Sequence, residues 1–582
     1  MSCTSRFSQG QHVYYVTPNH ARVCPDPRIP CHTLEEYVKM DGFLNRSDQT
    51  LLFLSGTHVL DTNVVIQGST NLAMVGDDSQ TQFSLTSNAP SSNIQCKGRF
   101  GFAFNVVQSL LIANLSFTKC GMDISELIPS IPRFGREGNI SVALGFRFAM
   151  NVNISGVLVQ NSTGFGIAGL NMFGSTQITN SALLYNQGDE KNFGGDAIFL
   201  FIIEQILCSI PSVDFIISSS HILYGSSPPT TALPTGLQII IQQECSHVKI
   251  QIINTSISHN INSGKEVPGA NLAIDVIYPA ESSGSHHIII DHCHIEGGKG
   301  SGAAGILFSV LSQQNITTLE QCMIDPTSEA SMFEIMRTQI IGNNATTSST
   351  GGGGLGILLN FCHNYNIIIT NVTLMENVIQ TQRDLDDAHL INAGGNAFIA
   401  VMPALPVHSV KIKDSTFKSG EGIAAGGLAI ATCPPHCTVG LDRNSSAIVP
   451  HELISISNTL FSNNTAIIGG ALGIVAVAEK LPVADSKCDA NLLMVQISES
   501  NFTNNFGIMG SALAAQSQDT YNTYDLLQSG YFSFVLYKCT FSNNQDLGSD
   551  YESFPEIYFK IENVNHATGE RWLSDSLGLP GS

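Results

Sequence analysis

The sequence predicts an all-β protein: a single right-handed parallel β-helix of about twelve coils with an N-terminal cap. Three observations support this fold. An octet recurs along the chain, a glycine-flanked apolar strand follows most of its copies, and charged residues make up only 13% of the composition. A chain of 582 residues would ordinarily indicate about four domains, but a stack of repeats absorbs that length.

The octet is well seen in ISISNTLF, which begins at Ile454. Its third place is Ile or Leu in every copy, its sixth is small or apolar, and its eighth is Phe, Leu, Ile or Val. We therefore expect places one, three, six and eight to face inward. Copies begin at residues 110, 152, 176, 215, 250, 288, 317, 367, 410, 454, 495 and 534.

The inward places change parity in the middle of the octet. Because a straight strand alternates strictly, the backbone must bend at the fourth or fifth place. Asn, Gly and Asp tolerate the left-handed backbone that a corner needs, and they are frequent at the fifth place. We expect the corner asparagines to point inward as a hydrogen-bonded stack. The corner asparagines are Asn114, Asn180, Asn254, Asn371 and Asn458, and two other copies have Gly156 and Asp414 at this place.

The glycine-flanked strands, such as GGALGIVA, supply a third strand to each coil. Parallel strands cannot be joined by tight hairpins, so this order predicts coils stacked by parallel pairing, and crossover rules make the coil right-handed. A leucine-rich repeat is the alternative. Its pattern places two residues between the second apolar position and its Asn, whereas one stands here, and no helical segment follows.

Charge excludes two classes of partner. The formal charge is −21 with only 26 Lys plus Arg, which repels nucleic acid and anionic membranes. Membrane insertion is not expected either, because the longest apolar run, AIFLFIIEQILCSI, is interrupted at Glu204 and Gln205.

The N-terminal segment, the cysteines and the sequons bear on the cellular location. The segment MSCTSRFSQGQ contains no secretory signal, so either the protein is cytosolic or its natural start is missing. Fourteen cysteines favour an oxidising compartment, and we expect an extracellular or cell-surface glycoprotein. The sequons taken as glycosylation sites, three of which we expect in loops, are Asn45, Asn344, Asn444 and Asn463.

Several motifs resemble known families. FSNNTAIIGGAL and FTNNFGIMGSAL resemble the FxxN and GGA(I/L/V) repeats of bacterial polymorphic outer membrane proteins, and more generally the pectin-lyase-like right-handed β-helix superfamily. The closest likeness is to large predicted extracellular β-helix proteins of early-branching animals. The segment VYYVTPNHARVCPDPRIPCHTLEEYV is similar to the openings of such helices. The resemblance spans roughly 10–560. We expect a cap over 1–50 (strand, cysteine loop, short helix), a β-helix over 51–560 and a tail over 561–582.

The best catalytic candidates are Asp291, His292 and His294 in IIIDHCHI. A carboxylate and imidazoles can act as acid and base on a sugar, or hold a metal. The structural interpretation is that Asp291 and His294 are ordinary outward residues, that His292 takes the corner place and that Cys293 fills the small inward place. We favour it because the aligned flanking corners are Asn254 and Gln321, the equivalent region is nearly free of Arg, and the NTD, GHG and RIK motifs of polygalacturonases are missing.

The cysteines fall into three groups. We expect a disulfide between Cys24 and Cys31 at the cap, and another between Cys433 and Cys437 in CPPHC, since no second pair stands nearby to complete a zinc site. The inward octet place holds three further cysteines, which we expect as core thiols: Cys293, Cys322 and Cys539.

These observations predict a non-enzymatic extracellular or cell-surface protein that displays loops for adhesion or glycan binding, with glycans or cell-surface proteins as partners. A polysaccharide lyase or glycoside hydrolase of the pectin-lyase-like superfamily is the alternative. No cofactor or metal is expected.

Overall fold

The computed structural model describes most of the repeat region and two compact units, 1–273 and 274–582. The described residues are 12–18, 24–26, 28–77, 89–124, 139–189, 192–203, 212–229, 235–243, 247–264, 269–278, 285–312, 331–346, 351–359, 365–380, 393–401, 409–432, 452–467, 469–476, 493–507, 511–517, 532–546 and 557–559. Among them, no helix is long and apolar enough to cross a membrane.

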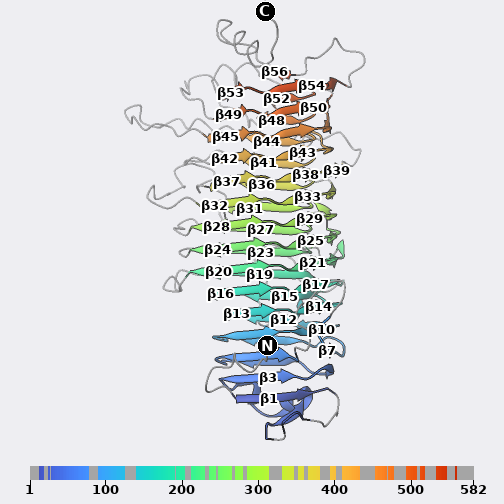
Figure 1. Ribbon diagram of the computed structural model, residues 1–582, viewed down its shortest axis with the longest axis vertical. Coiled ribbons are helices and arrows are strands. Elements are labelled where there is room, and N and C mark those ends of the chain that lie inside the picture. Colours follow the sequence, from blue (N-terminus) through green and yellow to red (C-terminus); the bar gives the residue numbers. More distant parts are fainter. Residues whose placement is uncertain are drawn as a thin grey trace, which may run out of the picture. The chain divides into compact units, whose positions relative to one another are not determined.

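In the first unit each coil gives one strand to each of three sheets, and each strand pairs in parallel with its counterpart in the next coil (Figure 1). The first sheet contains β2 (Cys31–Thr33), β1 (His12–Thr17), β3 (Gln49–Phe53), β6 (Leu72–Gly76), β9 (Leu110–Ala113), β13 (Met150–Ser155), β16 (Phe173–Thr179), β20 (Val213–Ser218) and β24 (Val248–Ile253). The second contains β4 (Gly56–Leu60), β7 (Ser92–Cys96), β10 (Leu115–Thr118), β14 (Leu158–Gln160), β17 (Ala182–Leu184), β21 (His221–Leu223) and β25 (Ser256–Ser258).

The third sheet of this unit contains β5 (Val64–Gln67), β8 (Phe102–Asn105), β12 (Asn139–Arg147), β15 (Phe165–Leu170), β19 (Gly195–Ile203) and β23 (Leu237–Gln243). Beside it, β11 (Met122–Asp123) pairs antiparallel with β12, and β18 (Asn192–Phe193) pairs parallel with β12. A short pair is formed by β22 (Ser226–Ser227) and β26 (Ile261–Asn262). The strand β27 (Leu272–Tyr278) contains the boundary between the units.

The second unit repeats the same plan. Its first sheet contains β28 (His286–Asp291), β32 (Ser331–Met336), β37 (Tyr365–Thr370), β42 (Ser409–Lys413), β45 (Glu452–Ser457), β49 (Leu493–Ser498) and β53 (Phe532–Tyr537). The second contains β29 (His294–Glu296), β33 (Gln339–Ile341), β38 (Thr373–Met375), β43 (Thr416–Lys418), β46 (Leu460–Ser462), β50 (Asn501–Thr503) and β54 (Thr540–Ser542).

The third sheet contains β31 (Ile306–Ser312), β36 (Leu355–Leu359), β41 (Ala397–Val401), β44 (Leu428–Thr432), β48 (Leu472–Ala476), β52 (Leu513–Ser517) and β56 (Ile557–Phe559). Short ladders add β30 (Lys299–Ser301), β34 (Asn344–Thr346), β39 (Val378–Gln380), β35 (Gly351–Gly352), β40 (Ala393–Gly394), β47 (Thr465–Ala466), β51 (Phe506–Gly507) and β55 (Gln545–Asp546). The fold is the right-handed parallel β-helix that the repeat predicts.

Burial follows the octet. In the copy that begins at Ile454, places one, three, six and eight are Ile454, Ile456, Thr459 and Phe461, and each is at most 1% exposed. The fifth place, Asn458, has a left-handed φ of 46°. The predicted sequence of strand, corner and strand is therefore confirmed, and apolar side chains of successive coils lie over one another in the core.

The corner asparagines do not form the predicted inward stack. Asn180, Asn254, Asn371 and Asn458 are exposed, and Asn114 is half-buried. The reason is the parity change itself: the left-handed residue rotates its own side chain outward while the chain turns beneath it. The neighbouring sixth place, not the fifth, points into the core.

A different column of asparagines forms the buried ladder, at the second Asn of motifs such as FSNN. Asn464 Nδ2 donates to Asn505 Oδ1 at 3.0 Å, and Asn505 Nδ2 donates to Asn544 Oδ1 at 2.9 Å. Each side chain also bonds the backbone, as when Gly420 N donates to Asn464 Oδ1 at 3.0 Å. The ladder satisfies turn amides and carbonyls that would otherwise be buried unpaired.

One coil differs in register from the sequence prediction. The octet assigned at 317, with Gln321 at its corner and Cys322 inward, lies outside the described residues. The coil that follows β28 and β29 is instead built by β32 and β33, with Arg337 at its corner. The octet of this coil is FEIMRTQI at 333–340, which the sequence prediction passed over in favour of the segment at 317.

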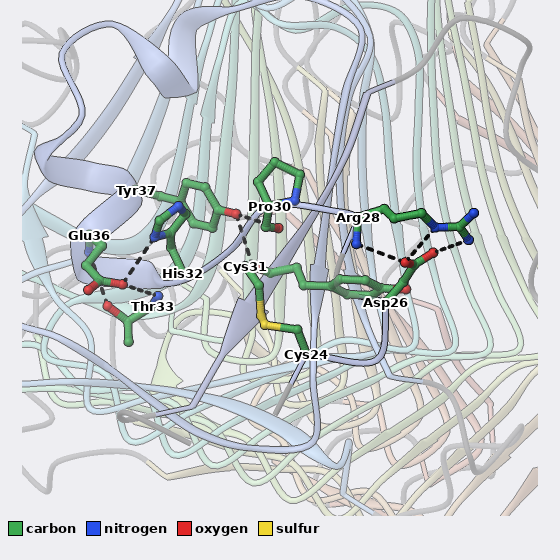
Figure 2. Close-up of a disulfide and its surroundings, with 10 residues drawn as sticks. Cys24, Asp26, Arg28, Pro30, Cys31, His32, Thr33, Glu36 and Tyr37 are labelled. Atoms are coloured by element: carbon green, nitrogen blue, oxygen red, sulfur yellow. Dashed lines mark hydrogen bonds and ion pairs between the residues drawn. A yellow bond between two sulfur atoms is a disulfide. The ribbon is translucent and has the colours of Figure 1, made fainter. Parts of the chain in front are cut away.

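The N-terminal elements precede the first coils. The helix α1 (Leu34–Lys39) begins with a capping box, in which Thr33 and Glu36 exchange side-chain and backbone bonds, and η2 (Phe43–Asn45) follows. A disulfide joins Cys24 and Cys31 beside α1 (Figure 2). The hydroxyl of Tyr37 donates to the Pro30 carbonyl at 3.1 Å, which ties the helix to this cysteine loop.

A second disulfide, between Cys96 and Cys120, was not predicted. The two cysteines stand 24 residues apart, one coil length, with Cα atoms 4.9 Å apart. The thiols of Cys293 and Cys539 are buried, and Cys293 Sγ donates to the Asp291 carbonyl at 3.4 Å. Cys433 and Cys437 lie outside the described residues, as does the proposed tail over 561–582.

Candidate functional site

The outward face of β28 and β29, together with β32 and β33 of the following coil, carries a cluster of ionisable side chains in the second unit. The registers place Asp291 opposite Met336, and His294 opposite Gln339. The corner between β28 and β29 is His292, and the corner between β32 and β33 is Arg337. We call Asp291, His292, His294, Glu296, Arg337 and Gln339 the corner cluster.

Asp291 lies between two corner residues. Its Oδ1 accepts from Arg337 Nε at 2.9 Å, and its Oδ2 accepts from a terminal nitrogen of Arg337 at 2.6 Å, so the pair is bidentate. Its Oδ1 also lies 3.0 Å from His292 Nδ1. The result is a chain of contacts from the guanidinium through the carboxylate to the imidazole.

The charge state of Asp291 follows from these partners. Its side chain is only 13% exposed, and burial by itself raises the pKa of a carboxyl group. The hydrogen bonds from Arg337 and His292 outweigh that effect and hold the pKa of Asp291 below its ordinary value. Asp291 is therefore an ionised carboxylate near neutral pH and holds the Nδ1 proton of His292.

The contact to Asp291 leaves the other ring nitrogen of His292 available. The His292 side chain is 53% exposed. With Nδ1 engaged as a donor, Nε2 of the neutral ring is an acceptor, which is the form required of a general base. A carboxylate that orients an imidazole in this way is a recurring arrangement in acid–base catalysis.

His294 has a different environment. Its Nδ1 lies 3.2 Å from Gln339 Oε1, and its Nε2 lies 2.9 Å from Glu296 Oε2. Both ring nitrogens thus face oxygen acceptors, and a ring that carries both protons satisfies both contacts. His292 and His294 thus lie two residues apart with different partners, a carboxylate for His292 and an amide oxygen and a second carboxylate for His294.

The backbone at these corners is unfavourable for the residues that occupy it. His292 has φ 52° and Arg337 has φ 47°. The left-handed region costs about 1–2 kcal/mol for a residue with a side chain, and less for Asn or Gly, which the same place holds in other coils. Other bulky residues also occupy this place, such as Glu499 and Lys538, so it is the contacts of His292 and Arg337 that distinguish them.

Sequence reasoning placed Asp291, His292 and His294 together, as the structure does, but missed Arg337. Two details of the structural interpretation match the structure, since Cys293 is buried and His292 takes the corner place. What was wrong was the conclusion that the neighbouring corner lacks Arg. The signal was present in FEIMRTQI, which fits the octet at 333–340.

Nearby groups complete the surface. His287, on the same strand as Asp291, lies 3.6 Å from Glu334 Oε1 of β32. Within the described part of the chain, no three His, Cys, Asp or Glu side chains are placed to hold a metal ion.

The predicted glycosylation residues have varied surroundings. Asn45 is exposed in η2 and accepts from Gln67 N at 2.8 Å through its side chain. Asn463 is exposed at a left-handed turn. Asn344 is half-buried within β34, so the expectation of a loop is wrong for it, and Asn444 lies outside the described residues.

No protein-family model and no curated protein matches this sequence. Three solved structures are similar in fold. One is a mannuronic-acid-specific polysaccharide family 6 lyase from human gut microbiota, 11% identical, covering 97% of this chain and 94% of that chain, with a TM-score of 0.35.

The second is a PL6 alginate lyase in complex with a trisaccharide, 9% identical over 94% of this chain and 89% of that chain, with a TM-score of 0.28. The third is a PL6 family alginate lyase with an arginine-to-alanine substitution, 10% identical over 91% of this chain and 80% of that chain, with a TM-score of 0.22. Similarity at this level assigns no role to any residue here.

Proposed function

We propose that the protein is a polysaccharide lyase, and that the corner cluster carries out β-elimination on a uronic-acid polysaccharide. The observation that supports this most is the contact chain from Arg337 through Asp291 to His292, with His294 nearby. Beta-elimination needs a base for the proton next to the carboxylate, a cation that neutralises that carboxylate, and an acid for the leaving oxygen. The cluster offers one group for each task.

Each residue then has a role. His292 Nε2 removes the proton, while Asp291 fixes the ring and its tautomer as a positioning residue. Arg337 uses Nε and one terminal nitrogen on Asp291, and its remaining donors are directed to the uronate carboxylate. His294 donates a proton to the departing glycosidic oxygen. The bond to that oxygen breaks, and the electrons left by the removed proton form a double bond in the sugar.

Hydrolysis fits the cluster less well. Glycoside hydrolases use two carboxyl groups, one of which must be protonated. Asp291 has a lowered pKa and both of its oxygens contact Arg337, so it is a poor proton donor and a hindered nucleophile.

The second candidate is a non-enzymatic function, in which the β-helix binds a glycan without cleaving it. Exposure favours it: His292 and Arg337 have side chains 53% and 49% exposed. A site open to water gains less from its charges than an enclosed one, because solvent screens them. In that case the corner cluster serves as a binding surface.

The reaction product distinguishes a lyase from a hydrolase and from a protein that only binds glycan. Wild-type protein is incubated with polyuronates and with neutral polysaccharides, and both ultraviolet absorbance of unsaturated sugar and new reducing ends are measured. A lyase produces the two signals together, and a hydrolase produces reducing ends alone. Binding without either signal would contradict the lyase proposal and support the second candidate.

A further inference from the structure

A column of exposed aromatic rings occupies the second corner of three successive coils in the first unit. Tyr185, Tyr224 and His259 follow β17, β21 and β25 (Figure 1 labels these strands). The rings of Tyr185 and Tyr224 are parallel within 5°, with centroids 4.7 Å apart, and the His259 ring continues the stack at 5.3 Å from Tyr224.

The fold does not require aromatic residues at this place. All three have left-handed backbones, with φ 57°, 64° and 58°. The same place holds Asn161 in an earlier coil and Asn463 in the second unit, which accept this conformation at less cost, but also Lys119 and Glu376. The rings are not buried in compensation, since Tyr185 and Tyr224 are 45% and 39% exposed.

The stacking of the rings offsets only part of the cost of the left-handed backbone. An aromatic pair contributes about 0.5–1.5 kcal/mol beyond the area it buries, whereas each left-handed residue costs about 1–2 kcal/mol. Three rings stacked in successive coils and left in solvent favour a role at the surface over one in stability.

The surroundings define the surface. Leu184 and Leu223 pair in register and are half-exposed beside the two tyrosines, and Ile261 is 43% exposed two residues after His259. We call Leu184, Tyr185, Leu223, Tyr224, His259 and Ile261 the aromatic patch. None of the six carries a fixed charge, on a chain whose net charge is −21.

We propose that the aromatic patch is a binding site for a neutral polysaccharide. Pyranose rings have apolar C–H faces bordered by hydroxyl groups, and tyrosine matches both with an apolar ring and a phenolic hydroxyl. The mutual stacking holds the rings in place before binding, which lowers the entropy lost on association. This inference goes beyond the proposed lyase activity, because it concerns another unit, another ligand and no catalytic step.

Size argues against a protein partner. A stable protein interface takes about 20–30 residues from each side, and the patch supplies six. Its lack of charge also gives an acidic polymer nothing to pair with. A single sugar chain is an occupant that this number of side chains can hold.

The test replaces each tyrosine by asparagine, the residue that another coil already has at this place. A Tyr185→Asn, Tyr224→Asn variant places at both corners the residue found at Asn161, so the backbone is retained or relieved. The matched control is Ser419→Asn, at the same place of a coil in the second unit, with φ 51°. Both are made in a His292→Ala, His294→Ala background, so that cleavage plays no part.

Affinity electrophoresis in gels containing hydroxyethyl cellulose, xylan, mannan or polyuronate measures binding. We expect at least one neutral polysaccharide to retard the parent protein, with a dissociation constant about tenfold or more higher in the tyrosine variant and unchanged in the control. Equal retardation of variant and parent overturns the proposal, as does the failure of every neutral polysaccharide to retard the parent.

Size-exclusion chromatography of the same proteins examines the alternative occupant. A change of oligomeric state in the tyrosine variant without a change in retardation would assign the patch to self-association and overturn the glycan site. The lyase proposal is judged separately, by turnover of polyuronate in protein with its histidines intact.

Discussion

Two columns of asparagine in this β-helix differ in what the fold requires of the side chain. The buried column, represented by Asn464, bonds side chain to side chain and side chain to backbone along the coils. The corner column, represented by Asn458, is exposed and adopts a left-handed backbone. In the first case the fold needs the amide group, whereas in the second it needs only a residue that tolerates positive φ.

The difference explains where functional residues occur. A buried ladder position cannot change chemistry without leaving polar groups unpaired. A corner position points to solvent, so its side chain is free to vary at a modest backbone cost. The corner cluster and the aromatic patch both use such corners: His292 and Arg337 at the first, Tyr185 and Tyr224 at the second.

The largest effect should come from the buried column. Asn464→Ala removes the acceptor for Gly420 N and the donor to the Phe417 carbonyl, and it interrupts the bond to Asn505. We expect a loss of about 3–5 kcal/mol in the free energy of unfolding, measured by urea denaturation. A loss below about 1 kcal/mol would mean that the ladder is not structurally required.

A natural exception in the ladder gives the second prediction. In the first unit Asn260 donates to Asn271, but Asn186 donates at 2.8 Å to a carboxyl oxygen of Asp196, which is fully buried. Burial raises the pKa of Asp196 well above its ordinary value of 3.8, although bonds from Asn186 oppose the rise. Asp196→Asn should therefore stabilise the protein at neutral pH, by about 1–3 kcal/mol.

The pH dependence of that change has a defined sign. Folding keeps Asp196 protonated above the unfolded value of 3.8, so native stability falls as pH rises from there toward the folded pKa. The gain in melting temperature from Asp196→Asn should be near zero in strong acid and grow as pH increases. A gain that is independent of pH would contradict a buried, protonated carboxyl.

The smallest effect should come from the corner. Asn458→Ala puts a less tolerant residue at φ 46° and loses the 2.7 Å bond to Asp414, for an expected cost of about 1 kcal/mol. Asn458→Gly loses the same bond but keeps the backbone freedom, and should be closer to wild type in thermal denaturation. If both variants lost equal stability, the side-chain bond would matter more than the backbone conformation.

Most of the fold could be predicted from the sequence because the inward positions repeat from coil to coil. Inward places such as Ile456 and Phe461 follow from periodicity alone, and the left-handed corner follows from the change of parity. The direction of the corner side chain did not follow, because Asn tolerates this backbone whether its amide is bonded or solvated. The ladder Asn464 was missed since it lies outside the octet.

The corner cluster was predictable only in part. Contacts within one coil, such as Asp291 to His292, are local in sequence and were visible. The contact from Arg337 depends on which residues form the next coil, and the insertion between β31 and β32 obscured that register. The disulfide between Cys96 and Cys120 was missed for a different reason, because the first coils do not follow the octet pattern.

The most direct test of the lyase proposal compares two histidines of one strand and its adjoining corner. Release of unsaturated uronate product is measured for wild type, His292→Ala and His287→Ala, the last being a half-exposed histidine outside the corner cluster. We predict that His292→Ala lowers the rate by about 10²–10⁴-fold, whereas His287→Ala stays near wild type. Equal rates in all three proteins would contradict the assignment of His292 as the base.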